Sequence, residues 1–139
     1  MAHPDLDELL NAVLPFGQQM LQKHGEFFPF GASKSATGDI AMDAFDLGVE
    51  RPASQEVIEG LLSAFRQAAG SGKVVATAIS FDSLYRADAS SKAVDAICVR
   101  IERVGGEAVT VNLPYKKKLF GGYSFGELVA SPLVPEVFV

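Results

Sequence analysis

Cysteine and histidine are scarce in this chain, and tryptophan is absent. Among 139 residues there is one cysteine, Cys98, and the two histidines are His3 and His24. A single cysteine excludes an intramolecular disulfide and a thiolate-rich metal cage, and two histidines leave little for a zinc site. We therefore expect no metal and no cofactor.

Long apolar runs and an excess of basic residues are also missing. No apolar stretch reaches the 18 residues of a membrane span, and the first residues lack the basic segment and apolar run of a secretory signal. Acidic residues outnumber basic ones by 17 to 12, which gives a formal charge of −5. Nucleic-acid binding usually needs a basic face. We expect a cytoplasmic protein with no membrane partner and no nucleic-acid partner.

What the chain does contain is typical of one globular domain. Its length of 139 residues and its 48% hydrophobic residues are enough to build a single core. No internal repeat or low-complexity segment interrupts it. We expect one domain over residues 1–139.

The first half of the chain predicts a helix followed by a strand pair. Apolar residues recur at helical spacing from Asp5 to His24, and Gly25 is suited to end that helix. Pro15 lies within it, so the helix either kinks there or restarts with Pro15 in its first turn. A short strand at 28–33, a turn at 36–39 and a returning strand at 40–47 then form a predicted hairpin.

The second half predicts one helix and three strands. The helix begins with Ser54 as its N-cap and ends at the glycines of residues 70–72. Three strands follow, at residues 73–85, 96–101 and 109–113; a polar loop separates the first two, and Gly105-Gly106 turns the chain between the last two. From Lys116 onward we expect one short strand or helix and an extended end.

These elements predict an α+β fold. An antiparallel sheet of about five strands would be packed by two main helices. The order helix, strand pair, helix and three strands resembles the profilin-like layout of roadblock-type dynein light-chain domains.

No catalytic arrangement is evident. His24 and Glu26 could form an acid–base pair, but a helix-capping histidine and a solvated glutamate explain them more simply. Cys98 lies within a strand, where we expect an inert thiol. Gly70-Ser71-Gly72-Lys73 follows a helix and precedes a strand, the reverse of the order in a phosphate-binding loop. The sequence favours a non-catalytic protein over an enzyme.

Two segments concentrate aromatic residues beside glycines. Residues 24–31, HGEFFPFG, hold three phenylalanines that either fasten the first helix to the sheet or form a binding surface. In the tail a basic triplet, residues 116–118, precedes further aromatics. This triplet could meet an anionic partner, or it could be a solvated turn. The candidate interaction surface comprises His24, Glu26, Phe30, Tyr115, Lys116, Lys117, Lys118, Phe120, Tyr123 and Phe125.

The predicted function is therefore that of a protein-interaction or regulatory module. Its partner would be another protein or a second copy of the chain, giving a homodimer. The alternative is a small-molecule-binding protein or an enzyme with a pocket near His24, Phe30 and Tyr115.

The HGEFFPFG segment resembles the signature of a family of small bacterial proteins to which no activity is assigned. PYKKK at residues 114–118 and GYSFGEL at residues 122–128 are similar to the C-terminal part of that family. The resemblance extends from the first helix to about Ala130. It implies a bacterial origin and a single domain, and it implies no catalytic residue.

Overall fold

A computed structural model describes residues 3–44 and 53–139. It contains α1 (Pro4–His24), β1 (Phe30–Ser35), β2 (Ile40–Asp43), α2 (Ser54–Gly70), β3 (Val74–Tyr85), β4 (Val94–Arg103), β5 (Ala108–Lys117), β6 (Tyr123–Phe125) and β7 (Val129–Pro132). The predicted α+β fold and the order of its first seven elements are confirmed. The end of the second predicted strand, residues 45–47, lies outside the described residues.

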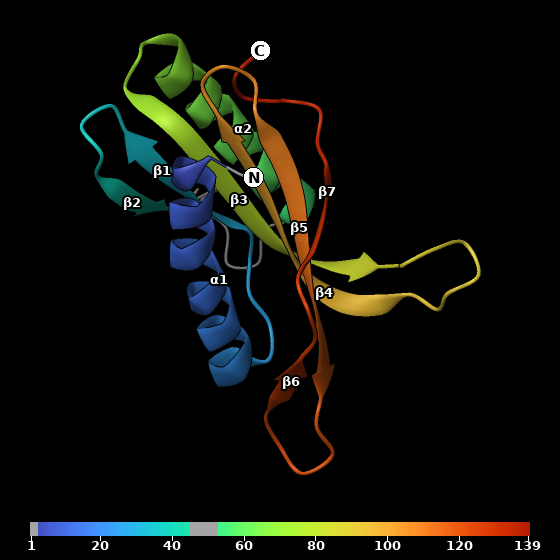
Figure 1. Cartoon of the computed structure of the whole chain (residues 1–139). Coiled ribbons are helices and arrows are strands. Elements are labelled where there is room, and N and C mark those ends of the chain that lie inside the picture. Colours follow the sequence, from blue (N-terminus) through green and yellow to red (C-terminus); the bar gives the residue numbers. More distant parts are fainter. Residues whose placement is uncertain (1–2, 45–52) are drawn as a thin grey trace.

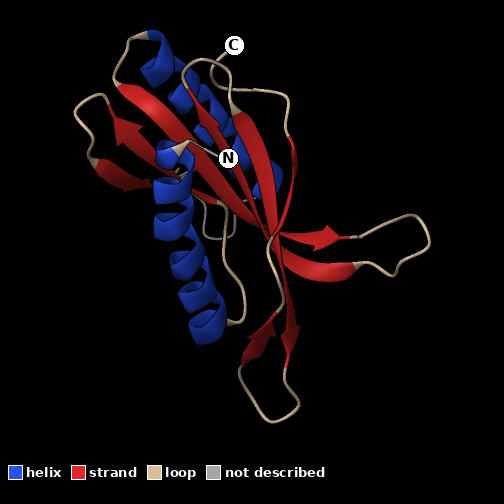
Figure 2. Ribbon diagram, viewed as in Figure 1, coloured by secondary structure: helices blue, strands red, loops and turns tan. Residues whose placement is uncertain are grey.

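All strands belong to one antiparallel sheet (Figure 2). Its order is β2-β1-β3-β4-β5, and two short strands then pair with different parts of β5. The strand β7 pairs with residues 109–112, and β6 pairs with residues 115–117. The described residues therefore form seven strands where about five were predicted, because the tail folds back along β5 twice.

The helix α1 packs on one face of the sheet. Its residues Leu9 and Val13 are fully buried, and they share a core with Ile97 of β4. Ala76 and Ala78 of β3 face the same core, and their small side chains let the helix lie close to the sheet.

The helix α2 packs on the opposite face, over β1 and β3. Its apolar stripe includes Leu61 and Phe65, which cluster with Ile79. The helix does not cover all of this face. The C-terminal segment, red in Figure 1, covers a further part of the face and places Val137 in the same apolar cluster.

Of the two alternatives at Pro15, the restart is not observed, because a single helix runs through this residue. Residues before and after Pro15, such as Val13 and Leu21, pack in one core, and this packing favours a continuous helix. The predicted N-cap of α2 is wrong: the N-cap is Ala53 rather than Ser54, and no side chain of the described residues caps this end.

The phenylalanines of residues 24–31 divide between the core and the surface. Phe27 and Phe30 are each 7% exposed, and their rings meet edge to face at 5.9 Å. The ring of Phe16 of α1 also meets that of Phe30 edge to face, at 4.9 Å. Phe28, in contrast, is 41% exposed. Two of the three aromatics fasten α1 to the sheet, so the structural interpretation holds for those two only.

The start of α1 is tied to the sheet by Asp5. Lys34 Nζ of β1 donates to its carboxylate at 2.6 Å, and Arg103 Nη2 of β4 lies 3.4 Å away. The bond from Lys34 is the main cause that lowers the pKa of Asp5 below its ordinary value of 3.8. A carboxyl with a lowered pKa stabilises the fold above its ordinary pKa, and this contribution disappears as pH falls.

We expect Asp5→Asn to lower the melting temperature by about 2–5 °C at pH 7. The difference from wild type should shrink as the pH falls below 3.8, because the wild-type carboxylate then becomes protonated. Melting curves between pH 2 and pH 7 would measure it, with Glu59→Gln on an exposed position of α2 as the control. A constant difference across this range would contradict the assignment.

Candidate functional site

The hairpin between β5 and β6 projects from the body of the sheet (Figure 1). Lys118 N–H donates to the carbonyl of Gly122 at 2.9 Å, and Gly121 N–H donates back to Lys118 at 3.3 Å. Gly121 has φ of 99°, a conformation that glycine adopts without strain. The loop is thus a tight three-residue turn whose first two members are Leu119 and Phe120.

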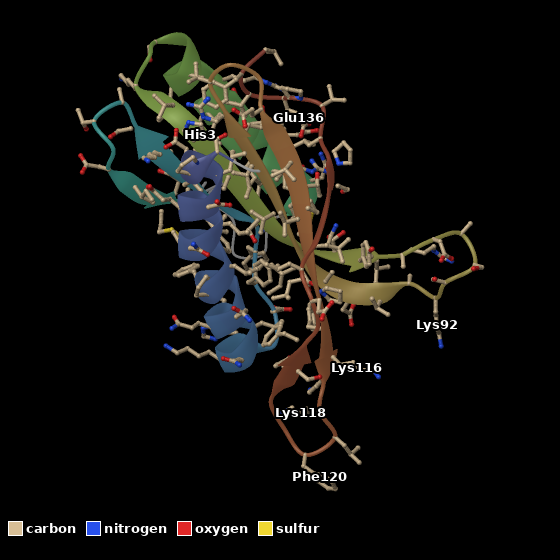
Figure 3. The ribbon with its side chains drawn as sticks, in the orientation of Figure 1. His3, Lys92, Lys116, Lys118, Phe120 and Glu136 are labelled. Carbon is tan, nitrogen blue, oxygen red and sulfur yellow. The ribbon has the colours of Figure 1, made fainter. Side chains whose placement is uncertain are left out.

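Both of these side chains point into solvent. Leu119 is 89% exposed, and Phe120, at 97%, is the most exposed large hydrophobic residue of the described chain. The lysines of residues 116–118 precede them, and no acidic residue occurs between Glu107 and Glu127. Residues 116–122 are named the β5–β6 tip below. Figure 3 shows Phe120 at its end and Lys116 and Lys118 beside it.

Two other hairpins close with the same pattern of hydrogen bonds. In residues 35–39 the Ser35 N–H donates to the carbonyl of Asp39 at 2.8 Å, and the Gly38 N–H donates to the carbonyl of Ser35 at 3.0 Å. In residues 103–107 the same two distances are 2.9 and 3.2 Å. The first of these turns is built with Ala36 and Thr37 where the tip has its two apolar side chains. The turn geometry therefore does not require leucine or phenylalanine.

The base of the hairpin is anchored by aromatic packing. The ring of Tyr115 meets that of Tyr123 edge to face at 5.8 Å and lies 6.4 Å from that of Phe125. All three pack against the α1 core. The Tyr123 hydroxyl also lies 3.7 Å from the point where a Cβ on Gly25 would stand. This packing joins the hairpin to the C-terminal end of α1 and presents the tip from a fixed base.

Tyr115 also forms a contact that the sequence did not reveal. Its hydroxyl donates to Asp82 Oδ1 at 2.7 Å. Burial, followed by the nearby charge of Asp95, raises the pKa of Asp82, while the bond from Tyr115 opposes that rise. Burial is also the main cause that raises the pKa of Tyr115. Asp82 lies on β3 and Tyr115 on β5, with β4 between them, so no local sequence pattern indicates the pair.

The predicted surface is only partly continuous. Tyr115, Tyr123 and Phe125 do come together, while Phe30 is buried in the core and does not belong to an exposed surface. His24 and Glu26 are exposed on either side of Gly25, next to the hairpin base.

Tyr115 lines a cavity of about 240 Å³ with Lys116 and Phe125. His24 and Phe30, which the sequence analysis placed beside Tyr115 in a pocket, do not line it.

The described residues offer few groups for covalent or metal chemistry. Cys98 is 5% exposed, and burial raises its pKa to about 11, so the reactive thiolate is scarce at neutral pH. Within residues 3–44 and 53–139, no group of three or more His, Cys, Asp or Glu could hold a metal ion. No helix in the same ranges is long and apolar enough to cross a membrane.

Comparisons with protein-family models, curated proteins and solved structures found no match to this chain.

Proposed function

We propose that this protein is a non-catalytic protein-interaction module whose contact point is the β5–β6 tip. The observation that supports this most strongly is the exposure of Leu119 and Phe120 in a turn that does not need them. Burying one such side chain stabilises a protein or a complex by roughly 1.5–3 kcal/mol, and the unbound tip lacks this stabilisation. Binding to an apolar pocket would recover it.

The charge around the tip indicates the kind of partner. Three of the 12 basic residues stand in a row here, whereas the whole chain carries a formal charge of −5. An extended anionic surface, such as a membrane or a nucleic acid, would repel the acidic body within a Debye length of about 8 Å. A compact pocket rimmed by carboxylates would contact only the tip, and it would stay away from the acidic body of the chain. We expect a folded protein with such a pocket, in the bacterial cytoplasm.

A small-molecule or enzymatic role remains a second candidate. The hydrogen-bonded pair of Tyr115 and Asp82 favours it, because both groups have raised pKa values and Tyr115 lines a cavity. Ligand screening by thermal shift, with Tyr115→Phe for comparison, would detect such a site.

The proposed function is tested by replacing the two apolar residues with those of the matching turn. We expect Leu119→Ala/Phe120→Thr to leave the free energy of unfolding within about 0.5 kcal/mol of wild type. Affinity for a partner should fall roughly 30-fold or more, because the tip supplies the central apolar contact. The partner would be captured from native lysate, purified and titrated against both proteins by calorimetry.

A matched control comes from the other projecting hairpin. Leu84 of β3 is 68% exposed, so Leu84→Ala removes a comparable apolar side chain away from the tip. Its affinity should equal that of wild type. Equal binding by the tip variant, or an equal loss with Leu84→Ala, would refute the assignment of the contact point.

A further inference from the structure

We infer that the β5–β6 tip binds a second copy of this chain, in an apolar cavity beside the first half of α1. This inference rests on the proposed function and adds the partner to it. The cavity has a volume of about 190 Å³. Leu6 and Leu10 of α1 form one wall, and Val109 and Val111 of β5 form the other.

The size of this cavity suits one aromatic ring. An apolar cavity of roughly 150 Å³ is enough to hold benzene. Phe120 is the one fully projecting ring of the tip, at 97% exposure. Leu128, 49% exposed, lies at the cavity and offers an apolar contact to a ring that enters.

The charges match as well. Asp7 lines the cavity, no basic residue does, and within the described ranges the Asp7 carboxylate forms no ion pair. It lies in the first turn of α1, where the helix end favours a negative charge. A lysine of an incoming tip, such as Lys117 or Lys118, would meet this carboxylate as its ring enters the cavity.

Other cavities of the described chain match the tip less well. Arg66 lines one of about 380 Å³, Lys73 one of about 420 Å³ and Lys116 the one of about 240 Å³, so each would repel a basic tip. A cavity of about 220 Å³ has the carboxylates of Asp82 and Asp95 but only one apolar wall residue, leucine. The cavity beside α1 alone among these combines an apolar lining with an unopposed carboxylate.

The tip cannot fill the cavity of its own chain. The hairpin base meets Gly25, at the C-terminal end of α1, whereas Leu6 and Leu10 lie near its start. At 1.5 Å per residue, the helix separates the two by roughly 25 Å. Figure 3 shows His3 at the upper end of α1 and Phe120 at the bottom of the view. The contact must therefore join two molecules, either as a reciprocal pair or as a head-to-tail row.

The test uses one variant defective in each half of the contact. Leu119→Ala/Phe120→Thr removes the projecting side chains. Ala130→Phe fills the cavity from the strand β7, where Ala130 is exposed. Sedimentation velocity on each pure protein, up to about 1 mM, measures its mean mass.

We expect the wild-type mass to rise with concentration and to rise less in 0.5 M salt. Each variant alone should stay monomeric, and a mixture of the two should regain association, because one intact tip and one intact cavity remain. Asp7→Lys should weaken association about tenfold, whereas Asp39→Lys, at an exposed turn that does not line the cavity, should leave it unchanged.

Two results would overturn the inference. One is a wild-type protein that stays monomeric up to about 1 mM; the other is a mixture of variants that associates no better than either alone. Neither result would touch the proposed function if the tip still binds a different purified protein. Loss of that binding as well would remove both.

Discussion

Replacing Glu102 with alanine should lower the free energy of unfolding by about 3 kcal/mol. The side chain is 3% exposed, and its Oε1 accepts three consecutive backbone N–H groups of the C-terminal segment. The distances are 2.9 Å from Glu136, 2.9 Å from Val137 and 3.3 Å from Phe138. Without the carboxylate these donors lose their partner, and a buried unpaired donor is costly.

The effect of Glu102→Ala should extend beyond the three hydrogen bonds to the packing of the C-terminal segment. Val137 completes the core of α2, and Arg66 Nε donates to the carbonyl of Glu136 at 2.7 Å. Once the carboxylate is gone, this segment has fewer bonds to hold it over the sheet. We therefore expect faster amide exchange at residues 136–138 and at the apolar face of α2.

Urea denaturation would measure the stability change, with two variants for comparison. Glu102→Gln keeps one acceptor oxygen and should lose about 1 kcal/mol. Glu107→Ala removes an exposed partner of Arg103, with N and O 3.5 Å apart, and should change stability by less than about 0.5 kcal/mol. Equal effects for Glu102→Ala and Glu107→Ala would show that the three amide bonds contribute little.

Gly31→Ala should destabilise the fold by about 2 kcal/mol, although it adds only one methyl group. The added Cβ would stand 2.7 Å from Phe65 Cζ and 3.1 Å from the carbonyl oxygen of Ala78. The phenyl ring is 5% exposed in the α2 core, and the carbonyl belongs to β3, so neither can withdraw easily. The helix α2 must shift away from the sheet to make room.

The control for this prediction is Gly70→Ala. Gly70 ends α2, and no described atom outside its chain neighbours and its own helix backbone lies within 4 Å of an added Cβ. We expect no loss and a gain of up to about 1 kcal/mol, since alanine is the better helix former. If both substitutions changed stability alike in urea denaturation, the close approach of Phe65 to Gly31 would not be the cause.

Local patterns predicted most of the secondary structure. The apolar spacing of residues 5–24 and the alternation in residues 73–85 each specify one face, so they also predict which side chains are buried. Ala76 and Ala78, on one face of the second of these segments, lie under α1. The prediction of Ser54 as the N-cap of α2 failed, and of the two alternatives at Pro15 the restart is not observed; both concern where a helix begins, and local preference alone does not decide that point.

The candidate site was predicted less well. The basic triplet and Phe120 were identified from composition, but the contact between Tyr115 and Asp82 was not, because it spans three strands. Phe30 was placed on the candidate surface although it is buried. The cavity beside α1 was also missed, since its walls come from α1, β5 and β7, which only folding brings together.

The sequence by itself determined the α+β class, the order of the first seven elements and the absence of an intramolecular disulfide, because periodicity, turn residues and cysteine count are local properties of the chain. The tertiary structure decided which aromatics are buried and which project. HGEFFPFG contributes two rings to the core, whereas the ring of Phe120 remains in solvent. The buried rings and the exposed ring all belong to phenylalanines in segments that contain glycines. They differ in what the rest of the fold places around them.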